Sequence, residues 1–87
     1  MANYKILIKP SAKKELEKIP KKDLQKIVVK IQDLSGNPRP VESEKLSGDD
    51  KFRIRQGNYR IVYSIEDEQL IIFVVKIGHR RDIYRRR

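Results

Sequence analysis

The architecture of this chain follows from residues 52–63, which read Phe52-Arg53-Ile54-Arg55-Gln56-Gly57-Asn58-Tyr59-Arg60-Ile61-Val62-Tyr63. Polar and apolar side chains alternate on both sides of a central Gln-Gly-Asn, and this period of two predicts a β-hairpin with one buried face. A slip of one residue would exchange the two faces, so the register is strongly constrained. The favoured register has a four-residue loop and pairs Arg55 with Arg60, Ile54 with Ile61, Arg53 with Val62 and Phe52 with Tyr63. The apolar side chains then pack together, and the three arginines share the opposite face.

A third strand extends this hairpin. Residues 70–77 form a nearly continuous apolar run, which is typical of a central strand buried on both sides. The acidic turn Glu66-Asp67-Glu68-Gln69 joins this run to the strand from Tyr59 to Ile65. Because both connections are short, the three strands must form an antiparallel meander.

The N-terminal half predicts one strand and two helices. Tyr4 to Lys9 is rich in strand formers. Pro10-Ser11 is a stop followed by a helix N-cap, and the helical spacing after it ends at Pro20. A longer helix follows and ends at a glycine C-cap, Gly36. Its apolar positions recur at helical intervals, and they are Leu24, Ile27, Val28, Ile31 and Leu34.

The order of elements indicates an α+β fold. The predicted order is β-α-α-β-β-β, with two N-terminal helices on one face of an antiparallel sheet and a short helix or tail from Arg80 onward. Residues 39–50 are polar and are expected to form a connecting loop. The uncovered side of the sheet is then a basic concavity in which Arg60 lies exposed beside Arg55. The length of 87 residues predicts a single domain, 1–87.

The charge of the chain predicts a polyanionic partner. Lysine and arginine number 21 against 12 acidic residues, which gives a net charge of +9. Eight of the nine arginines lie from Arg53 onward, and no acidic residue occurs from Lys51 to Ile65. The planar guanidinium group favours bidentate contact with phosphate. RNA, DNA, the ribosome, an anionic membrane and an acidic protein all fit a charge of this size.

Other partners and compartments are less compatible with the composition. With no cysteine and one histidine, the chain predicts no disulfide and no structural metal, and nothing indicates a cofactor. The N-terminus lacks the pattern of a signal peptide, and no apolar run has transmembrane length. We therefore expect a cytoplasmic protein without a membrane partner.

Several short motifs occur in an order and spacing that resemble a known family. They are the strand-helix-helix opening, Lys45-Leu46-Ser47-Gly48, Phe52-Arg53-Ile54-Arg55, Asn58-Tyr59-Arg60-Ile61-Val62-Tyr63, Val75 to Gly78, and His79-Arg80-Arg81-Asp82-Ile83-Tyr84. Together they cover nearly the whole chain. On these motifs the chain is identified as a member of the RelE/ParE toxin superfamily, and within it the chain resembles the RelE-type messenger-RNA interferases.

The resemblance implies a fold similar to small microbial ribonucleases and a toxin of a type II toxin–antitoxin system. It implies ribosome-dependent cleavage of mRNA in the ribosomal A site, inhibition of translation, and neutralisation by an acidic, RelB-like antitoxin. The family's functional positions correspond here to Arg53, Arg55, Arg60, Arg80 and Tyr84. Guanidinium groups can stabilise the charge that develops on phosphate, and a tyrosine can stack on a base.

One departure from the family leaves the general base unassigned. Family members often carry lysine in the pair occupied here by Arg53 and Arg55, and arginine stays protonated and is a poor base. His79 has the only side chain whose ordinary pKa lies near neutrality, so it is a candidate catalytic residue. As an ordinary residue it would be a structural cap or a spectator.

The remaining basic residues have both a functional and a structural explanation. We expect five further basic residues to bind RNA or the ribosome, and they are Lys51, Arg81, Arg85, Arg86 and Arg87. The terminal run from Arg85 to Arg87 is also compatible with simple solvation. Two other functions stay open, namely a ParE-like inhibitor of DNA gyrase and a noncatalytic RNA-binding or ribosome-binding module. The sequence does not define codon preference, the antitoxin, the stoichiometry of the complex, or the conformation of the tail.

Overall fold

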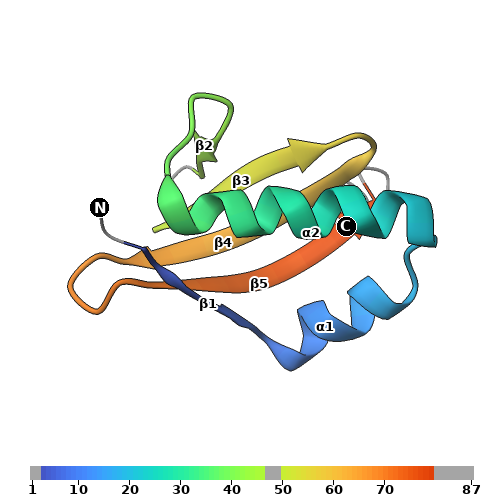
Figure 1. Ribbon diagram of the computed structural model, residues 1–87, viewed down its shortest axis with the longest axis horizontal. Helices are drawn as coiled ribbons and strands as arrows, with labels where there is room; N and C mark the ends of the chain where they lie inside the picture. Colours follow the sequence, from blue (N-terminus) through green and yellow to red (C-terminus); the bar gives the residue numbers. More distant parts are fainter. Residues whose placement is uncertain (1–2, 47–49, 80–87) are drawn as a thin grey trace.

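The fold is described from a computed structural model, in which residues 3–46 and 50–79 are described (Figure 1). The elements follow one another in the order β1 Lys5–Ile8, α1 Pro10–Glu17, α2 Lys21–Gly36, β2 Glu44–Lys45, β3 Lys51–Gln56, β4 Tyr59–Glu66 and β5 Ile71–His79. The predicted order β-α-α-β-β-β is confirmed, with one short strand added. Neither helix in the described residues is long and apolar enough to cross a membrane.

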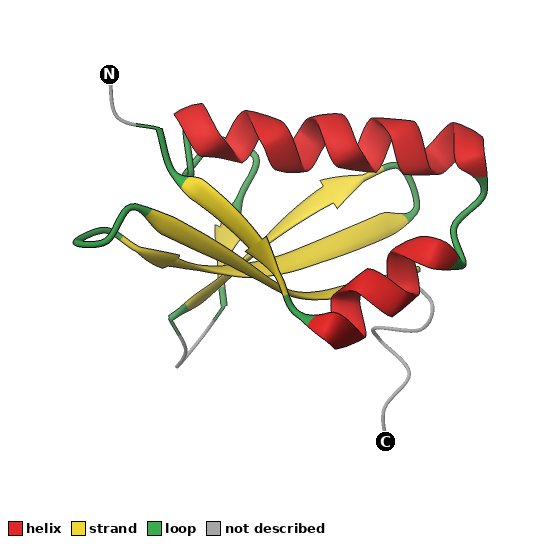
Figure 2. Ribbon diagram, turned by 60° about the horizontal axis from the view of Figure 1, so that its bottom comes forward, coloured by secondary structure: helices red, strands yellow, loops and turns green. Residues whose placement is uncertain are grey.

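The strands form one sheet with the order β1-β5-β4-β3-β2. β3, β4 and β5 make the predicted antiparallel meander, whereas β1 pairs in parallel with β5. Both helices lie on the same side of this sheet (Figure 2). The prediction that the last strand is central is wrong, because β4 occupies the middle position and β5 lies between β4 and β1. β5 is nevertheless an interior strand, with a paired neighbour on each edge.

The hairpin of β3 and β4 has the predicted register. Arg55 pairs with Arg60, Ile54 with Ile61, and Phe52 with Tyr63. Pairing continues to Gln56 and Tyr59, so the turn consists of Gly57 and Asn58 and is shorter than the predicted loop. Gly57 has φ 61°, a left-handed conformation that glycine adopts without steric cost and that suits a two-residue hairpin turn.

The helix ends differ from the predicted caps. α1 begins at Pro10 itself, with Lys9 in the N-cap position, so Ser11 lies within the first turn and is not the cap. Proline is well suited to this first position because its fixed φ is helical and its missing N–H needs no partner there. Gly36 is the last residue of α2, and the C-cap is Asn37, not the predicted glycine. Its main-chain N–H donates a hydrogen bond to the carbonyl of Asp33.

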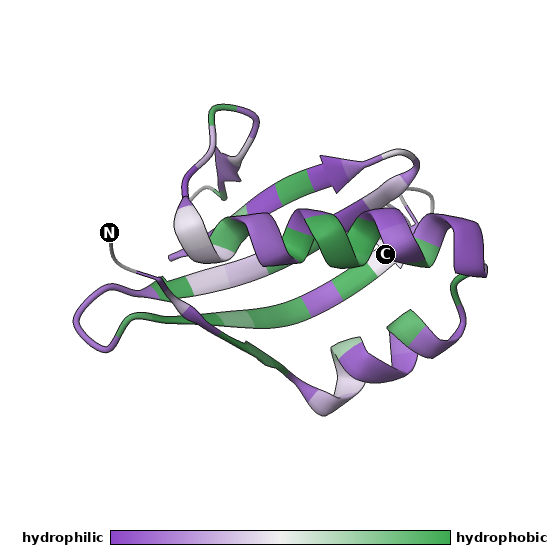
Figure 3. Ribbon diagram, in the orientation of Figure 1, coloured by the Kyte–Doolittle hydropathy of each residue, from purple (hydrophilic) through white to green (hydrophobic). Residues whose placement is uncertain are grey.

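A single hydrophobic core lies between the helices and the sheet. It is formed by Ala12, Ile19, Ile27, Ile31, Leu34, Ile54, Ile61, Tyr63, Ile72, Val74 and Ile77. Apolar and polar residues alternate along β3 (Figure 3), which is why one face of the strand joins this core and the other does not. Tyr63 is fully buried, and its hydroxyl donates a hydrogen bond of 2.8 Å to the carbonyl of Pro38. Tyr63 belongs to the core as its predicted register requires, and Tyr59 is partly buried and packs against it.

Polar contacts join the N-terminal strand to the β4–β5 turn. The hydroxyl of Tyr4 donates to Asp67 Oδ1 at 2.8 Å, and the guanidinium of Arg39 donates to both carboxylate oxygens at 3.2 and 2.8 Å. Arg39 also lies over the ring of Phe52, 5.5 Å from its centroid. The hydrogen bond from Arg39, followed by that from Tyr4, lowers the pKa of Asp67. Arg39, which is the single arginine before Arg53, therefore has a structural role.

Truncation of the core strand tests the packing. Ile61→Ala removes a fully buried side chain, and we expect it to lower the free energy of unfolding by about 2–5 kcal/mol through lost burial and a residual cavity. Urea denaturation measures the loss. Val29→Ala is the control, because Val29 is 55% exposed on α2 and its truncation should change stability by less than about 0.5 kcal/mol. Equal losses in the two variants would contradict this description of the core.

Asp67→Asn tests the polar network through pH. A lowered pKa means that the carboxylate stabilises the fold above the ordinary aspartate pKa, about 3.9, and that the contribution disappears as pH falls through the lower folded value. We expect the variant to melt below the wild type at pH 7 and the two melting temperatures to converge in strong acid. A difference that stays constant with pH would show that the charge of Asp67 is not involved.

Candidate nucleic-acid interface

The β3–β4 hairpin places the arginines on the sheet face opposite the helices. Side chains alternate along a strand, so with Ile54 in the core its neighbours Arg53 and Arg55 project the other way. Arg60 is the cross-strand partner of Arg55 and therefore shares its face. The predicted grouping of the three arginines is confirmed by the register.

Arg60 is much less accessible than predicted. Only 4% of the residue is exposed, whereas Arg55 is exposed and Arg53 is half-buried. The prediction that Arg60 lies exposed in a basic concavity is wrong in this respect, because strand alternation gives the direction of a side chain and not what covers it. Its cross-strand neighbour on β5 is Gly78, which has no side chain to fill the adjacent space. Burial restricts the guanidinium and withdraws it from water.

A carboxylate that the sequence reasoning missed lies among these arginines. Glu44 belongs to the short edge strand β2 and pairs across the ladder with Arg53. Arg53 Nη2 donates a hydrogen bond of 2.5 Å to Glu44 Oε1. This hydrogen bond is the main cause that lowers the pKa of Glu44, and the charges of Arg55 and Arg60 act in the same direction. Glu44 was missed because residues 39–50 were expected to form a loop. A loop residue has no strand register, so its pairing with Arg53 was not predicted.

Two lysines extend the basic face. Lys51 pairs with Ser64, and Lys76 of β5 pairs with Val62, so both lie on the same side of the sheet as Arg53. Lys51 was predicted as a binding residue, whereas Lys76 was not. Its signal in the sequence was that it is the single charged residue within the apolar run of residues 70–77. We name the arginine face that part of this side which is formed by Arg53, Arg55, Arg60, Lys51, Lys76 and Glu44.

His79 lies on the other side of the sheet. It pairs with Tyr59, which shares the helix-covered side with Ile61. The two rings meet edge to face with centroids 5.4 Å apart. The structure thus brings Arg53, Arg55 and Arg60 together and separates His79 from them. The remaining predicted residues lie outside the described residues, and they are Arg80, Arg81, Tyr84, Arg85, Arg86 and Arg87.

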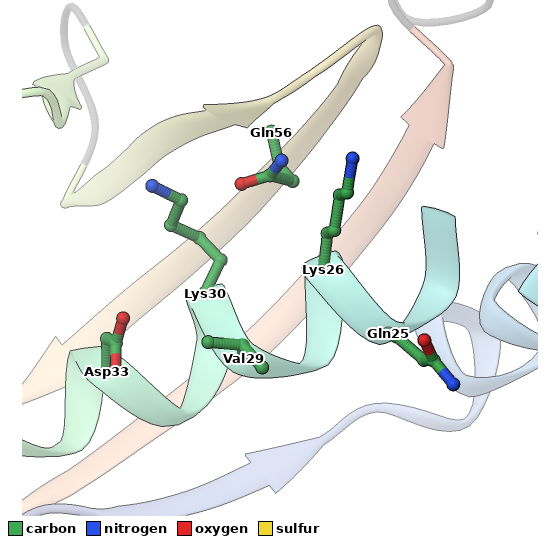
Figure 4. Close-up of a pocket in the computed structure, with 6 residues that line it drawn as sticks. All are labelled: Gln25, Lys26, Val29, Lys30, Asp33 and Gln56. Carbon is green, nitrogen blue, oxygen red and sulfur yellow. The ribbon is translucent and has the colours of Figure 1, made fainter. Parts of the chain in front are cut away.

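A groove of about 320 Å³ runs beside α2, away from the arginine face (Figure 4). Its lining residues are Gln25, Lys26, Val29, Lys30, Asp33 and Gln56. Lys30 forms an ion pair with Glu42 at 3.1 Å. Within residues 3–46 and 50–79 there is no cluster of three or more histidine and acidic residues that could hold a metal. The arginine face offers guanidinium groups, two ammonium groups and the carboxylate of Glu44, a set suited to a phosphate and a nearby proton.

The comparisons with known proteins agree on one family of proteins. Residues 6–84 match the family described as the ParE toxin of type II toxin–antitoxin system, parDE. The toxin RelG of Mycobacterium tuberculosis is 35% identical over 88 residues, which cover 95% of this chain and 98% of RelG. The mRNA interferase toxin RelE of Escherichia coli K12 is 32% identical over 72 residues, covering 79% of this chain and 75% of RelE.

The fold also agrees with a solved structure. The crystal structure of the toxin–antitoxin complex RelBE2 from Mycobacterium tuberculosis contains a chain that superposes with a TM-score of 0.82 at 28% identity. The match covers 91% of this chain and 93% of that one. Both the core and the β3–β4 hairpin therefore belong to an arrangement already found in a solved protein.

Proposed function

The chain belongs to the RelE/ParE superfamily of toxins from type II toxin–antitoxin systems, and we propose that it is a ribosome-dependent endoribonuclease that cleaves mRNA in the A site and inhibits translation. The observation that carries the proposal is the convergence of Arg53, Arg55 and Arg60 on one sheet face. A relative named as an mRNA interferase supports the same reaction. Action on translating ribosomes would place the protein in the cytoplasm.

The proposed reaction is the attack of a ribose 2′-hydroxyl on the neighbouring phosphate. Negative charge develops on the phosphoryl oxygens, and fixed guanidinium groups stabilise it without reorganisation at the moment of reaction. Arg60 suits this role because its burial limits its motion and weakens competition from water. Arg80 would contribute a second cation and Tyr84 a stacking or orienting ring. The product is a 2′,3′-cyclic phosphate or its hydrolysed form.

The regulatory partner in this proposal is an acidic, RelB-like antitoxin. The similar chain from Mycobacterium tuberculosis was solved in a toxin–antitoxin complex. A net charge of +9 favours an acidic segment that folds as it wraps around the toxin. Such a segment would cover the arginine face and compete with RNA for it.

A ParE-like inhibitor of DNA gyrase is the second candidate, because the matched family is described as the ParE toxin. Both functions use a basic surface, but only the nuclease needs phosphate-stabilising groups and a base within reach of one reacting centre. An assay of RNA cleavage therefore distinguishes the two candidates, whereas the affinity for nucleic acid does not.

Primer extension on a translated message should give new 5′ ends within codons when protein and ribosomes are both present. We expect naked RNA to be cut poorly, since the ribosome supplies the in-line positioning, which can be worth several kcal/mol. Efficient cutting without ribosomes would overturn ribosome dependence. Growth arrest with inhibited gyrase supercoiling and intact message would favour the ParE-like function instead.

Arg60→Ala should lower the single-turnover cleavage rate by about two to three orders of magnitude, the usual scale for one lost charge-stabilising donor. Arg60→Lys should recover only part of the rate because it keeps the charge without the planar fork. Thermal unfolding of each variant separates a catalytic loss from a folding defect. Lys14→Ala, on the exposed side of α1, is the basic control and should retain the wild-type rate. An Arg60→Ala protein that stays folded and cleaves normally would refute this role.

A further inference from the structure

A cavity of about 570 Å³ lies at one corner of the sheet, where β4 ends. The pairing of β3 with β4 begins at Lys51 and Ser64, so β4 continues for two residues, Ile65 and Glu66, beyond the paired part of β3. The lining of the cavity includes Ser64, Ile65 and Glu66. The cavity therefore lies near the β4–β5 turn, at the opposite end of these strands from the β3–β4 turn (Figure 1).

Planar side chains are stacked beside this cavity. The rings of Tyr63 and Phe52 have centroids 5.8 Å apart and an interplanar angle of 23°. The guanidinium of Arg39 lies over the ring of Phe52, and two hydrogen bonds to Asp67 fix its orientation. Arg39 lines the cavity, and its side chain is 48% exposed, so much of the guanidinium remains accessible. A planar cation held in this way is a surface on which a nucleobase can stack.

The charge of the cavity differs from that of the arginine face. Its acidic lining residues are Asp50, Glu66 and Asp67, and its basic lining residues are Arg39 and Lys45. Carboxylates thus outnumber cations in this cavity, although the whole chain has a net charge of +9. The arginine face is therefore the better place for a phosphate, whereas the cavity suits the uncharged edge of a base.

Glu66 supplies a carboxylate that can distinguish the four bases. It is exposed at the end of β4, and an ionised carboxylate only accepts hydrogen bonds. Guanine presents two adjacent donors on its Watson–Crick edge, N1–H and the 2-amino group, which match the two oxygens of a carboxylate. Each of the other three bases places an acceptor beside its donor on that edge and would set this acceptor against the carboxylate.

We propose that this cavity is a second RNA subsite, in which a nucleobase stacks on Arg39 and donates hydrogen bonds to Glu66. The inference rests on the proposed function, since it takes single-stranded RNA as the substrate. Ser64 lines the cavity and pairs with Lys51 of the arginine face, and Lys51 is two residues from Arg53 along β3. That separation is about 7 Å at the rise of a strand, so a nucleotide near the phosphate on Arg53 can reach the cavity. The subsite adds a preference for guanine to phosphate contacts that carry no sequence information.

Equilibrium binding measures this preference without ribosomes and without cleavage. The probes are short, fluorescent 2′-O-methyl oligoadenylates, which cannot be cleaved, and they carry a central adenine, guanine, cytosine or uracil. We expect the protein to bind the guanine probe about tenfold more tightly than the other three, the scale of one bidentate contact between a side chain and a base. Equal affinities for the four probes would overturn the proposal.

Glu66→Gln and Glu68→Gln form a matched pair of variants. Both remove one exposed carboxylate from the same end of the sheet, and only Glu66 of the two lines the cavity. We expect Glu66→Gln to reduce the preference for guanine to less than about threefold and Glu68→Gln to retain it. Retention of the preference in Glu66→Gln, or its loss in both variants, would remove Glu66 from the subsite.

Arg39→Lys tests the stacking surface, because lysine can keep the ion pair with Asp67 but has no planar group. Stacking tolerates every base, so we expect this variant to bind all four probes more weakly, by about fivefold or more. Thermal unfolding shows whether the variant is folded, and unchanged affinities in a folded variant would overturn the stacking.

Two results separate the subsite from the function on which it rests. Cleavage of mRNA on ribosomes by a protein that binds the four probes equally would refute the subsite and leave the proposed function intact. Absence of cleavage together with absence of binding to any probe would refute both.

Discussion

The arrangement of this protein depends on the pairing of Ile54 with Ile61 across the β3–β4 hairpin. Both side chains lie in the core, and the period of two in a strand then fixes every neighbouring side chain. A slip of one residue would bury Arg53 and Arg55 against the helices and expose the isoleucines, which is prohibitively unfavourable. The hydrophobic core thus determines where the positive charges lie, although no arginine of the hairpin belongs to it.

This constraint has an electrostatic cost. Arg55 and Arg60 are directly opposite on adjacent strands, where like charges repel, and Arg60 is nearly removed from water. Glu44 offsets part of that repulsion through its hydrogen bond with Arg53 and through its proximity to the other two arginines. The short strand β2, which contributes few contacts of its own, therefore matters chiefly because it carries this carboxylate to the arginine face.

The sequence predicts those features that depend on local interactions and leaves open those that depend on tertiary contacts. Alternation and helical spacing are local, and they correctly gave both helices, the meander and the hairpin register. The predicted N-cap of α1 was wrong because the sequence is compatible with a helix that begins at Pro10 or after Ser11. The choice between them depends on the path of the chain from β1 into α1. The two-residue strand β2 has no pattern of its own, so Glu44 became visible only through its pairing with Arg53. The burial of Arg60 is a tertiary property, and strand periodicity carries no information about it.

The burial of Arg60 links binding to stability. Burial of a charged group carries a desolvation cost, and a bound phosphate whose oxygens accept hydrogen bonds from the guanidinium would offset part of it. A polyanion that binds the folded state and not the unfolded one then stabilises the chain by mass action. The same relation applies to an acidic antitoxin, which would neutralise the charge, cover the face and raise the stability together. In the proposed function, binding of phosphate and stabilisation by an anionic partner would therefore both involve the buried guanidinium of Arg60.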